Sequence, residues 1–192
     1  MLRSLRIHAI LLLAGTLTAC AGEEDMTSGV TVKMDPAQFQ AAQSDVPKRA
    51  RVEVVDVRQE IRNERTAAFN TSMGHVSFEP PETDLVKAML ESRVNAVLAK
   101  SGTSATPPVI YSGIRAFDVE TPATALYWDV RIRVELVLRV NQVDRVVSGE
   151  GTERTYAWPS AEVIKKATNQ ALLQVGSESE AALSELLAAP SH

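Results

Sequence analysis

Few side chains in this sequence are suited to catalysis or metal binding. The 192 residues contain three histidines and a single cysteine. His8 and His192 lie near the two ends of the chain, which leaves His75 as the candidate general base or metal ligand. No cysteine or second histidine lies near His75 in the sequence to share a metal ion. A serine nucleophile would need His75 as its base, so a hydrolase built on His75 is one hypothesis.

Three acidic residues, Glu79, Glu82 and Asp84, surround a pair of prolines. Acidic side chains gather at helix N-termini because the helix dipole favours negative charge there. A predicted helix begins at this point, so a general acid–base pair is not needed to explain the group. We therefore predict no metal ion, no cofactor and no catalytic residue, and we expect that the protein is not an enzyme.

The strongest polar feature is a row of arginines, Arg131, Arg133 and Arg139, at even spacing in one stretch. Residues two apart in a strand share a face, so the three guanidinium groups are expected on one side of a sheet. Two interpretations stay open. The face is either solvated, with its charges paired across strands, or it docks another envelope protein or an anionic polymer. Tyr127 and Tyr156 would add the aromatic contact area that interfaces favour.

The stretch that positions these arginines covers residues 126–140. Every even position in it is apolar, and most odd positions are charged or polar. This period of two predicts a long strand with one covered and one water-facing side. On this pattern Trp128 points to the covered side.

The N-terminus carries a different signal. Arg3 and Arg6 precede a short apolar run, residues 9–17, which is about half of what a membrane-spanning helix needs. The ending Leu17-Thr18-Ala19-Cys20 resembles a bacterial lipobox, in which the chain is cut before the cysteine and the thiol is acylated. We predict a signal peptide at residues 1–19 and lipid attachment at Cys20. Each buried methylene of the lipid contributes about 0.8 kcal/mol to anchoring.

Composition and breaker residues divide the rest of the chain. We predict a lipidated N-terminus and tether over residues 20–50, and a single α+β domain over residues 51–189. Ala21, rather than Asp, follows the lipidated position, which in such lipoproteins resembles an outer-membrane address. The formal net charge of −4 argues against a nucleic-acid partner, because nucleic-acid binding usually needs a basic surface.

Runs of strands separated by helices favour α+β layers over alternating βαβ units. The main strands are predicted at residues 51–58, 109–119, 126–140 and 146–158. Helices are predicted at residues 83–100 and from residue 160, with a break or kink at Gly176 and Ser177 before a second segment at residues 180–189. A turn at residues 141–145 would join the long hairpin. The expected fold is an antiparallel sheet of about four strands with two main helices packed on one face.

The order of these features resembles the YajG family of bacterial lipoproteins. The likeness rests on the lipobox at Cys20, the strand end at residues 54–58, the helix at residues 85–102, the hairpin strand and Thr155-Tyr156. The resemblance implies an outer-membrane lipoprotein of unsettled role with no known catalytic residues. The layout also looks like other small envelope lipoprotein domains that serve as accessory subunits or synthase activators.

These observations lead to one main function hypothesis and one alternative. The first is a lipid-anchored protein on the periplasmic side of the outer membrane that docks to an envelope protein through its exposed sheet face or edge. The alternative is a periplasmic carrier of lipid or another small molecule, with a cavity between helices and sheet. An unpaired sheet edge would also allow a homo-oligomer by strand addition.

Overall fold

The structure, a computed structural model, describes residues 29–39, 50–67, 71–101 and 108–188. Cys20 therefore lies outside the described residues. The elements in chain order are β1 (Val30–Lys33), the 3₁₀ helix η1 (Pro36–Phe39), β2 (Arg51–Asp56), β3 (Glu64–Thr66), β4 (Ser72–Glu79), α1 (Glu82–Ser101), β5 (Val109–Glu120), β6 (Trp128–Val140), β7 (Val143–Thr155) and α2 (Ala161–Ala188).

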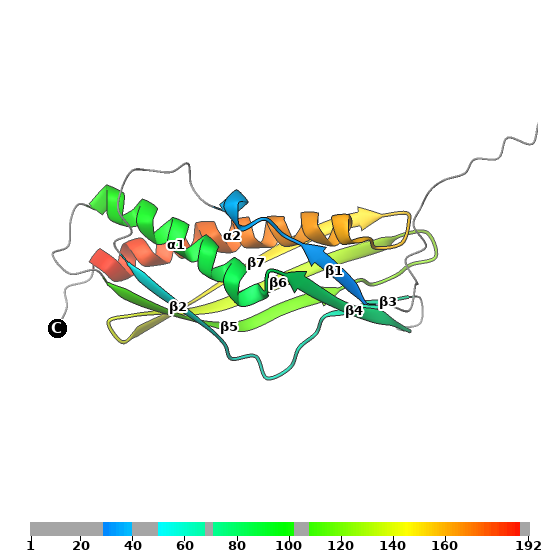
Figure 1. The fold of residues 1–192 in the computed structure, drawn as a ribbon, viewed down its shortest axis with the longest axis horizontal. Coiled ribbons are helices and arrows are strands. Elements are labelled where there is room, and N and C mark those ends of the chain that lie inside the picture. Colours follow the sequence, from blue (N-terminus) through cyan, green and yellow to red (C-terminus); the bar gives the residue numbers. More distant parts are fainter. Residues whose placement is uncertain (1–28, 40–49, 68–70, 102–107, 189–192) are drawn as a thin grey trace, which may run out of the picture.

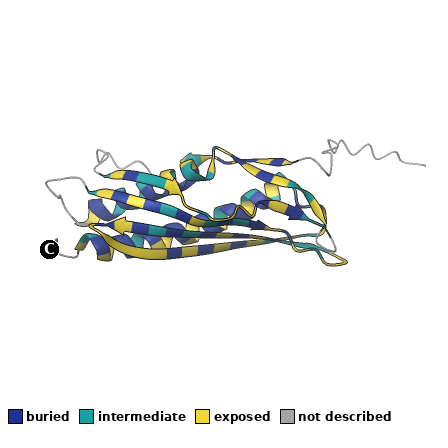
Figure 2. Ribbon diagram, turned by 90° about the horizontal axis from the view of Figure 1, so that it is seen from below, coloured by how far each residue is buried: buried dark blue, intermediate teal, exposed yellow. Residues whose placement is uncertain are grey.

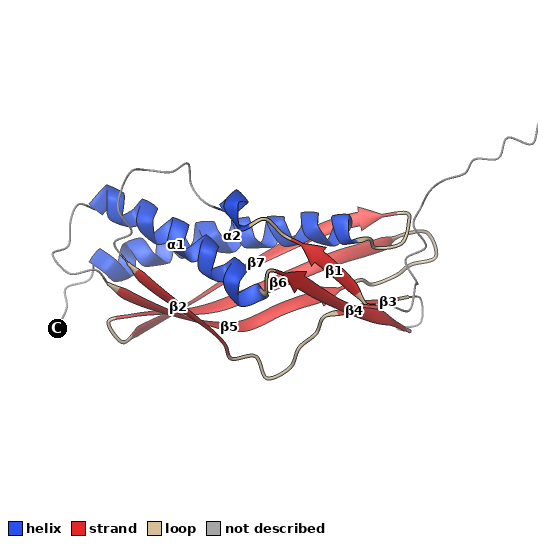
Figure 3. Cartoon of the chain, viewed as in Figure 1, coloured by secondary structure: helices blue, strands red, loops and turns tan. Residues whose placement is uncertain are grey.

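Two mixed sheets form the strand layer, where a purely antiparallel sheet was predicted (Figure 3). In the larger sheet, with strand order β2-β5-β6-β7, β2 runs parallel to β5 and the other pairs are antiparallel. The prediction was wrong for β2. Helix α1 lies between β2 and β5 in the chain and returns the chain to the end of the sheet at which β2 begins, so β5 runs parallel to β2. The smaller sheet has the order β1-β4-β3, with β1 parallel to β4.

The segment after β2 links the two sheets. The chain leaves β5 after Asp56 and returns at Asn63, which forms a bridge with Val119. The N–H of Val119 donates to the carbonyl of Arg62, and the N–H of Val76 donates to the carbonyl of Asn63. A short piece of chain therefore lies between β5 and β4, and the strands of both sheets form one curved layer (Figure 1).

Both helices pack on one face of the larger sheet, as predicted (Figure 1). The alternation predicted for residues 126–140 is confirmed from Val130 onward: the even positions of β6 are buried there and the odd positions are not, which produces the banded strands of Figure 2. It fails at the start, because the strand begins at Trp128, which is half-buried, and Leu126 lies before the strand with 76% of its surface exposed. Gly149 and Gly151 of β7 permit the close approach of α2. A Cβ at Gly151 would overlap the backbone of Ala167, so only glycine fits beneath the helix there.

α2 is one continuous helix, so the predicted break at Gly176 is wrong. Gly176 is buried, and a Cβ there would lie 3.3 Å from the sulfur of Met89 in α1. One turn further on, Glu180 accepts from Lys100 at 2.7 Å and pairs with Arg93 at 3.5 Å. Packing against α1 offsets the roughly 1 kcal/mol that an interior glycine costs a helix.

The β6–β7 hairpin turns more tightly than the sequence suggested. Asn141 and Gln142 alone make the turn, with φ values of 49° and 65°, and β7 begins at Val143. Positive φ at both central residues gives the turn that matches the right-handed twist of the flanking strands. The predicted turn at residues 141–145 is therefore too long, and the partner strand begins three residues before its predicted start.

The fold begins before residue 51. Val30 and Val32 of β1 and Phe39 of η1 are buried in the hydrophobic core. β1 pairs with β4 through Val30–Val76 and Val32–Phe78. Part of the segment predicted as a tether is thus packed against the domain.

Candidate functional site

The face of the larger sheet that the helices leave uncovered carries the candidate site. Its side chains form rows across the strands, because the register pairs each residue with one on its neighbour. One row runs Val55, Gly113, Val137 and Val146. The rows nearest the middle of β6 are ionic instead, with Arg133 opposite Asp118 on one side and Glu150 on the other. We call the first of these the apolar row. We call the rows that contain Arg131 and Arg133 the ionic half of the uncovered face.

The predicted arginines lie on this face, and each is paired within the chain. Arg133 donates to Glu135 at 2.8 Å, and Arg131 lies 3.9 Å from Asp129. Arg139 makes a two-point contact with its cross-strand neighbour Asp144, at 2.6 and 2.7 Å. More than half of each arginine side chain is exposed. The arrangement therefore fits the solvated face with paired charges, while leaving the guanidinium groups accessible to a partner.

Neighbouring groups shift the pKa values of three carboxyl groups on this face. The hydrogen bonds from Arg139 lower the pKa of Asp144, and those from Arg154 lower the pKa of Asp129. Burial instead raises the pKa of Asp118, against the pull of Arg62 and Arg133. Partial burial therefore disfavours the charged form of Asp118, in contrast to Asp129 and Asp144.

A groove that sequence reasoning missed lies across the apolar row. Its volume is about 540 Å³, and its lining residues come from β2, the segment after it, β5 and β6: Val55, Val57, Tyr111, Ser112, Gly113, Arg115, Val137 and Arg139. Val55, Val57 and Tyr111 are exposed although they are apolar or aromatic. The sequence signal was Val137, the one apolar side chain among the odd positions of the long strand.

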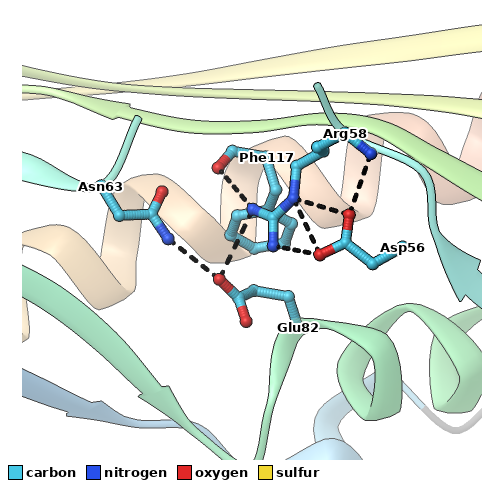
Figure 4. A network of polar contacts seen from close by, with 5 residues as sticks. All are labelled: Asp56, Arg58, Asn63, Glu82 and Phe117. Carbon is cyan, nitrogen blue, oxygen red and sulfur yellow. Dashed lines mark hydrogen bonds and ion pairs between the residues drawn. The ribbon is translucent and has the colours of Figure 1, made fainter. Parts of the chain in front are cut away.

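Behind this face, a buried arginine closes the gap left where β2 departs from β5 (Figure 4). The Arg58 side chain is 4% exposed and contacts Asp56 at 2.6–3.1 Å. It donates to the carbonyl of Phe117 at 3.3 Å and lies 3.6 Å from Glu82, which accepts from Asn63 at 2.9 Å. The hydrogen bonds from Arg58 lower the pKa of Asp56. These contacts join the end of β2, β5 and the start of α1.

The candidate catalytic residues do not converge. His75 has a 79% exposed side chain and lies 3.7 Å from Glu64. Glu82 is held by Arg58 and Asn63 at the start of α1. In the parts of the chain that the structure describes, no three acidic, cysteine or histidine side chains gather in a way that could hold a metal ion. The described helices include none with the length and apolar character needed to span a bilayer.

One edge of the larger sheet is partly closed by α2. The outward N–H groups of Glu150 and Thr152 in β7 donate to the side-chain oxygens of Gln174 and Gln170, at 3.0 and 3.1 Å. Gln170 and Gln174 lie one helical turn apart, so they reach alternate residues of the strand. These two N–H groups are therefore already paired and would have to be freed before a further strand could pair with them.

Comparisons with known proteins do not assign a family. No family model and no curated protein matches the chain. Among solved structures, an uncharacterised protein matches with a TM-score of 0.42 and 8% identity, over 85% of this chain and 100% of that chain. A Xanthomonas campestris protein of the family DUF330 matches with a TM-score of 0.41 and 16% identity, over 83% and 94%. A candidate lipoprotein from Caulobacter crescentus CB15 matches with a TM-score of 0.32 and 14% identity, over 55% and 85%.

Proposed function

We propose that the chain is a non-enzymatic envelope lipoprotein that docks another envelope protein through the uncovered face of its larger sheet. In this proposal lipidated Cys20 anchors it to the outer membrane, on the periplasmic side, as in the YajG family that the sequence resembles. The observation that carries the proposal is the groove along the apolar row, where exposed apolar or aromatic side chains of β2, the segment after it and β5 lie together beside half-buried Val137.

The arrangement of charge around the groove supports a protein partner. Protein interfaces commonly have an apolar centre and a polar, solvent-accessible rim. Here Arg115 and Arg139 lie among the groove's lining residues, and the ionic half continues the face along β6. Charged rims contribute more to partner choice and association rate than to affinity. The apolar row would then supply binding energy, and Arg131 and Arg133 would supply specificity.

The sheet face is favoured over the sheet edge as the contact. Gln170 and Gln174 already occupy the outward N–H groups along half of β7. A homo-oligomer by strand addition at this edge would have to displace them. Docking through the face requires no such rearrangement.

A photoreactive side chain tests the docking proposal directly. Tyr111 in the groove and Leu173 on α2 have similar exposed fractions, 46% and 50%, so Leu173 is a matched control on the opposite layer. We replace each in turn with benzoylphenylalanine, irradiate living cells and identify adducts by mass spectrometry. A discrete protein adduct at Tyr111 and none at Leu173 is expected. Equal adducts at both positions, or none at Tyr111, would remove the proposal.

Two variants then separate the parts of the face. Val137→Asp places a charge in the apolar row, whereas Arg131→Glu with Arg133→Glu reverses the ionic half. Both changes lie on the uncovered face, so near-native melting temperatures are expected. We expect the Tyr111 adduct to disappear with Val137→Asp and to weaken with the double reversal. An adduct that survives Val137→Asp would show that the groove is not the centre of the contact.

The carrier alternative predicts a cavity between the helices and the sheet. The groove, by contrast, is lined by residues of the uncovered face. Native mass spectrometry of the chain without its lipid distinguishes the two functions. A ligand that remains bound would favour the carrier, and an unliganded mass would favour docking.

A further inference from the structure

The end of the molecule where β6 begins and β7 finishes holds both tryptophans and two of the three tyrosines. The chain has two tryptophans and three tyrosines. Both tryptophans meet here, as Trp128 and Trp158 lie edge to face with ring centres 5.5 Å apart. Tyr127 and Tyr156 make a second edge-to-face pair at 6.2 Å. We call this region the aromatic end.

Two large side chains at the aromatic end project into solvent. Leu126 and Tyr156 are each 76% exposed, more than the other exposed large hydrophobic residues. The turn that carries Leu126 is fixed, because the Thr124 hydroxyl accepts from the N–H groups of Leu126 and Tyr127 and donates to the carbonyl of Tyr127. The exposure of Leu126 is therefore built into the loop. Exposed apolar side chains that lie together in a patch are typical of protein or membrane contact sites, whereas single ones are ordinary.

A cation accompanies the aromatic rings. The Arg154 guanidinium lies 4.0 Å from the centre of the Tyr127 ring and contacts Asp129 at 2.8 Å. Tryptophan and tyrosine are enriched at membrane–water interfaces, where their rings sit at the level of the lipid headgroups. Arginine keeps its charge in the headgroup region while its stem covers apolar surface. A projecting leucine among these residues has the chemistry of a shallow membrane contact.

The aromatic end is also the end at which the described fold begins. β4 starts at Ser72 beside Thr66, whose N–H donates to the Thr121 hydroxyl at the start of the β5–β6 connection. β1 runs parallel to β4, so its first residue, Val30, points toward the same end. Figure 1 shows the beginning of β1, β3 and the β5–β6 connection together. A lipid on Cys20 would therefore hold this end nearest to the bilayer.

The length of the chain before β1 limits where the bilayer can lie. Val30 is ten residues after Cys20, and ten extended residues span at most about 35 Å. The hairpin turn after β6 lies at the opposite end, roughly 40 Å along its 13 residues. The aromatic end is thus within reach of an anchored membrane surface, and the hairpin turn is the part held furthest from it.

We propose that the aromatic end rests on the lipid surface, with Leu126 and Tyr156 inserted at headgroup depth. The proposal rests on the lipid anchor of the proposed function. It sets the orientation of the molecule: the sheet stands away from the membrane, and the groove on the uncovered face is presented to a partner in the periplasm.

A probe at two matched positions tests this orientation. Leu126→Cys and Val143→Cys, both at exposed apolar residues at opposite ends of β6 and β7, are labelled with an environment-sensitive fluorophore in the lipidated protein. The proteins are reconstituted into vesicles of phosphatidylethanolamine and phosphatidylglycerol. We expect a blue shift and quenching by brominated acyl chains for the label at Leu126, and neither for the label at Val143. Loss of quenching at Leu126 in the Tyr156→Ser background would support insertion by both side chains.

Mass spectrometry of the same samples separates the two proposals. Where Cys20 is acylated and the label at Leu126 stays in water, the lipid contact is overturned and the anchored docking function stands. A label that is buried in native membranes but not in pure lipid vesicles would likewise overturn it, in favour of a protein contact. An unmodified Cys20 would overturn the anchored function and this inference with it.

Discussion

The covered and uncovered faces of the larger sheet are built from the same strands, yet they differ in which substitutions they tolerate. On the covered face, α2 approaches so closely that Gly149 and Gly151 have no room for a side chain. On the uncovered face, exposed ion pairs flank a groove, and Gly113 faces only the side chain of Val57. Because the covered face is closely packed, a substitution that adds even one methyl group there is expected to change stability. The uncovered face can accept substitutions without disturbing the packing, which is what a docking surface requires.

Substitution of a glycine should give the largest difference in stability between the two faces. Gly151→Ala would drive a methyl group into the backbone of Ala167, so α2 must move. We expect a loss of about 2–3 kcal/mol in the free energy of unfolding, near the upper end of overpacking effects. Gly113→Ala is the matched control, because the Val57 side chain can turn away. Chemical denaturation of both variants gives the comparison, and equal stabilities would show that the two faces are not packed differently.

Arg58 lies behind the uncovered face and should be the next most sensitive position. Arg58→Met removes the partner of Asp56, Glu82 and the Phe117 carbonyl. We expect a loss of about 1–2 kcal/mol, because Asp56 is partly exposed and recovers some hydration. Arg62→Met, which breaks the exposed pair with Glu60, serves as control and should melt like the wild type. If both variants melt alike, the buried arginine does not hold β2 against β5.

The Arg58 contact also predicts a dependence on pH. The pKa of Asp56 is lowered in the folded state from its ordinary value of 3.8. A lowered carboxyl pKa contributes stability that is fully present above the unfolded pKa and is lost as the pH falls through the folded pKa. The stability gap between wild type and Arg58→Met should therefore narrow as the pH is lowered from 7 to below 3.8. A gap that stays constant in urea titrations at these pH values would assign the loss to packing alone.

The smallest effect on stability is expected at the arginines that stand out in the sequence. Arg131→Ala with Arg133→Ala removes two exposed ion pairs, and surface substitutions of this kind usually change stability by less than about 0.5 kcal/mol. A thermal melt of the double variant measures this directly. A loss above 2 kcal/mol would show that the ionic half of the uncovered face stabilises the fold, leaving it less free for a partner.

Several features of the fold were predictable because local patterns decide them. The period of two in β6 predicted the right element type, since a strand with this pattern must bury one face. Other features depended on distant partners. The parallel pairing of β2 follows from the return of the chain through α1, and Gly176 stays helical because Met89 and Arg93 lie against it.

The candidate site divides in the same way. The exposure of Arg131, Arg133 and Arg139 follows from alternation and is confirmed, whereas docking through them stays a prediction. The groove could not be predicted, because its lining residues come together only through the register of β2, β5 and β6. Arg58 reads as an ordinary charged residue at the end of a strand, and only the departure of β2 from β5 buries it.

The order of residues alone determined which side of β6 is apolar and where α1 lies, because periodicity and breaker residues are local properties. Tertiary structure decided which strands are neighbours, how closely α2 approaches β7 and where the exposed apolar side chains meet. Those outcomes depend on the packing of segments that are far apart in the chain, where the fit of one backbone against another outweighs local preference.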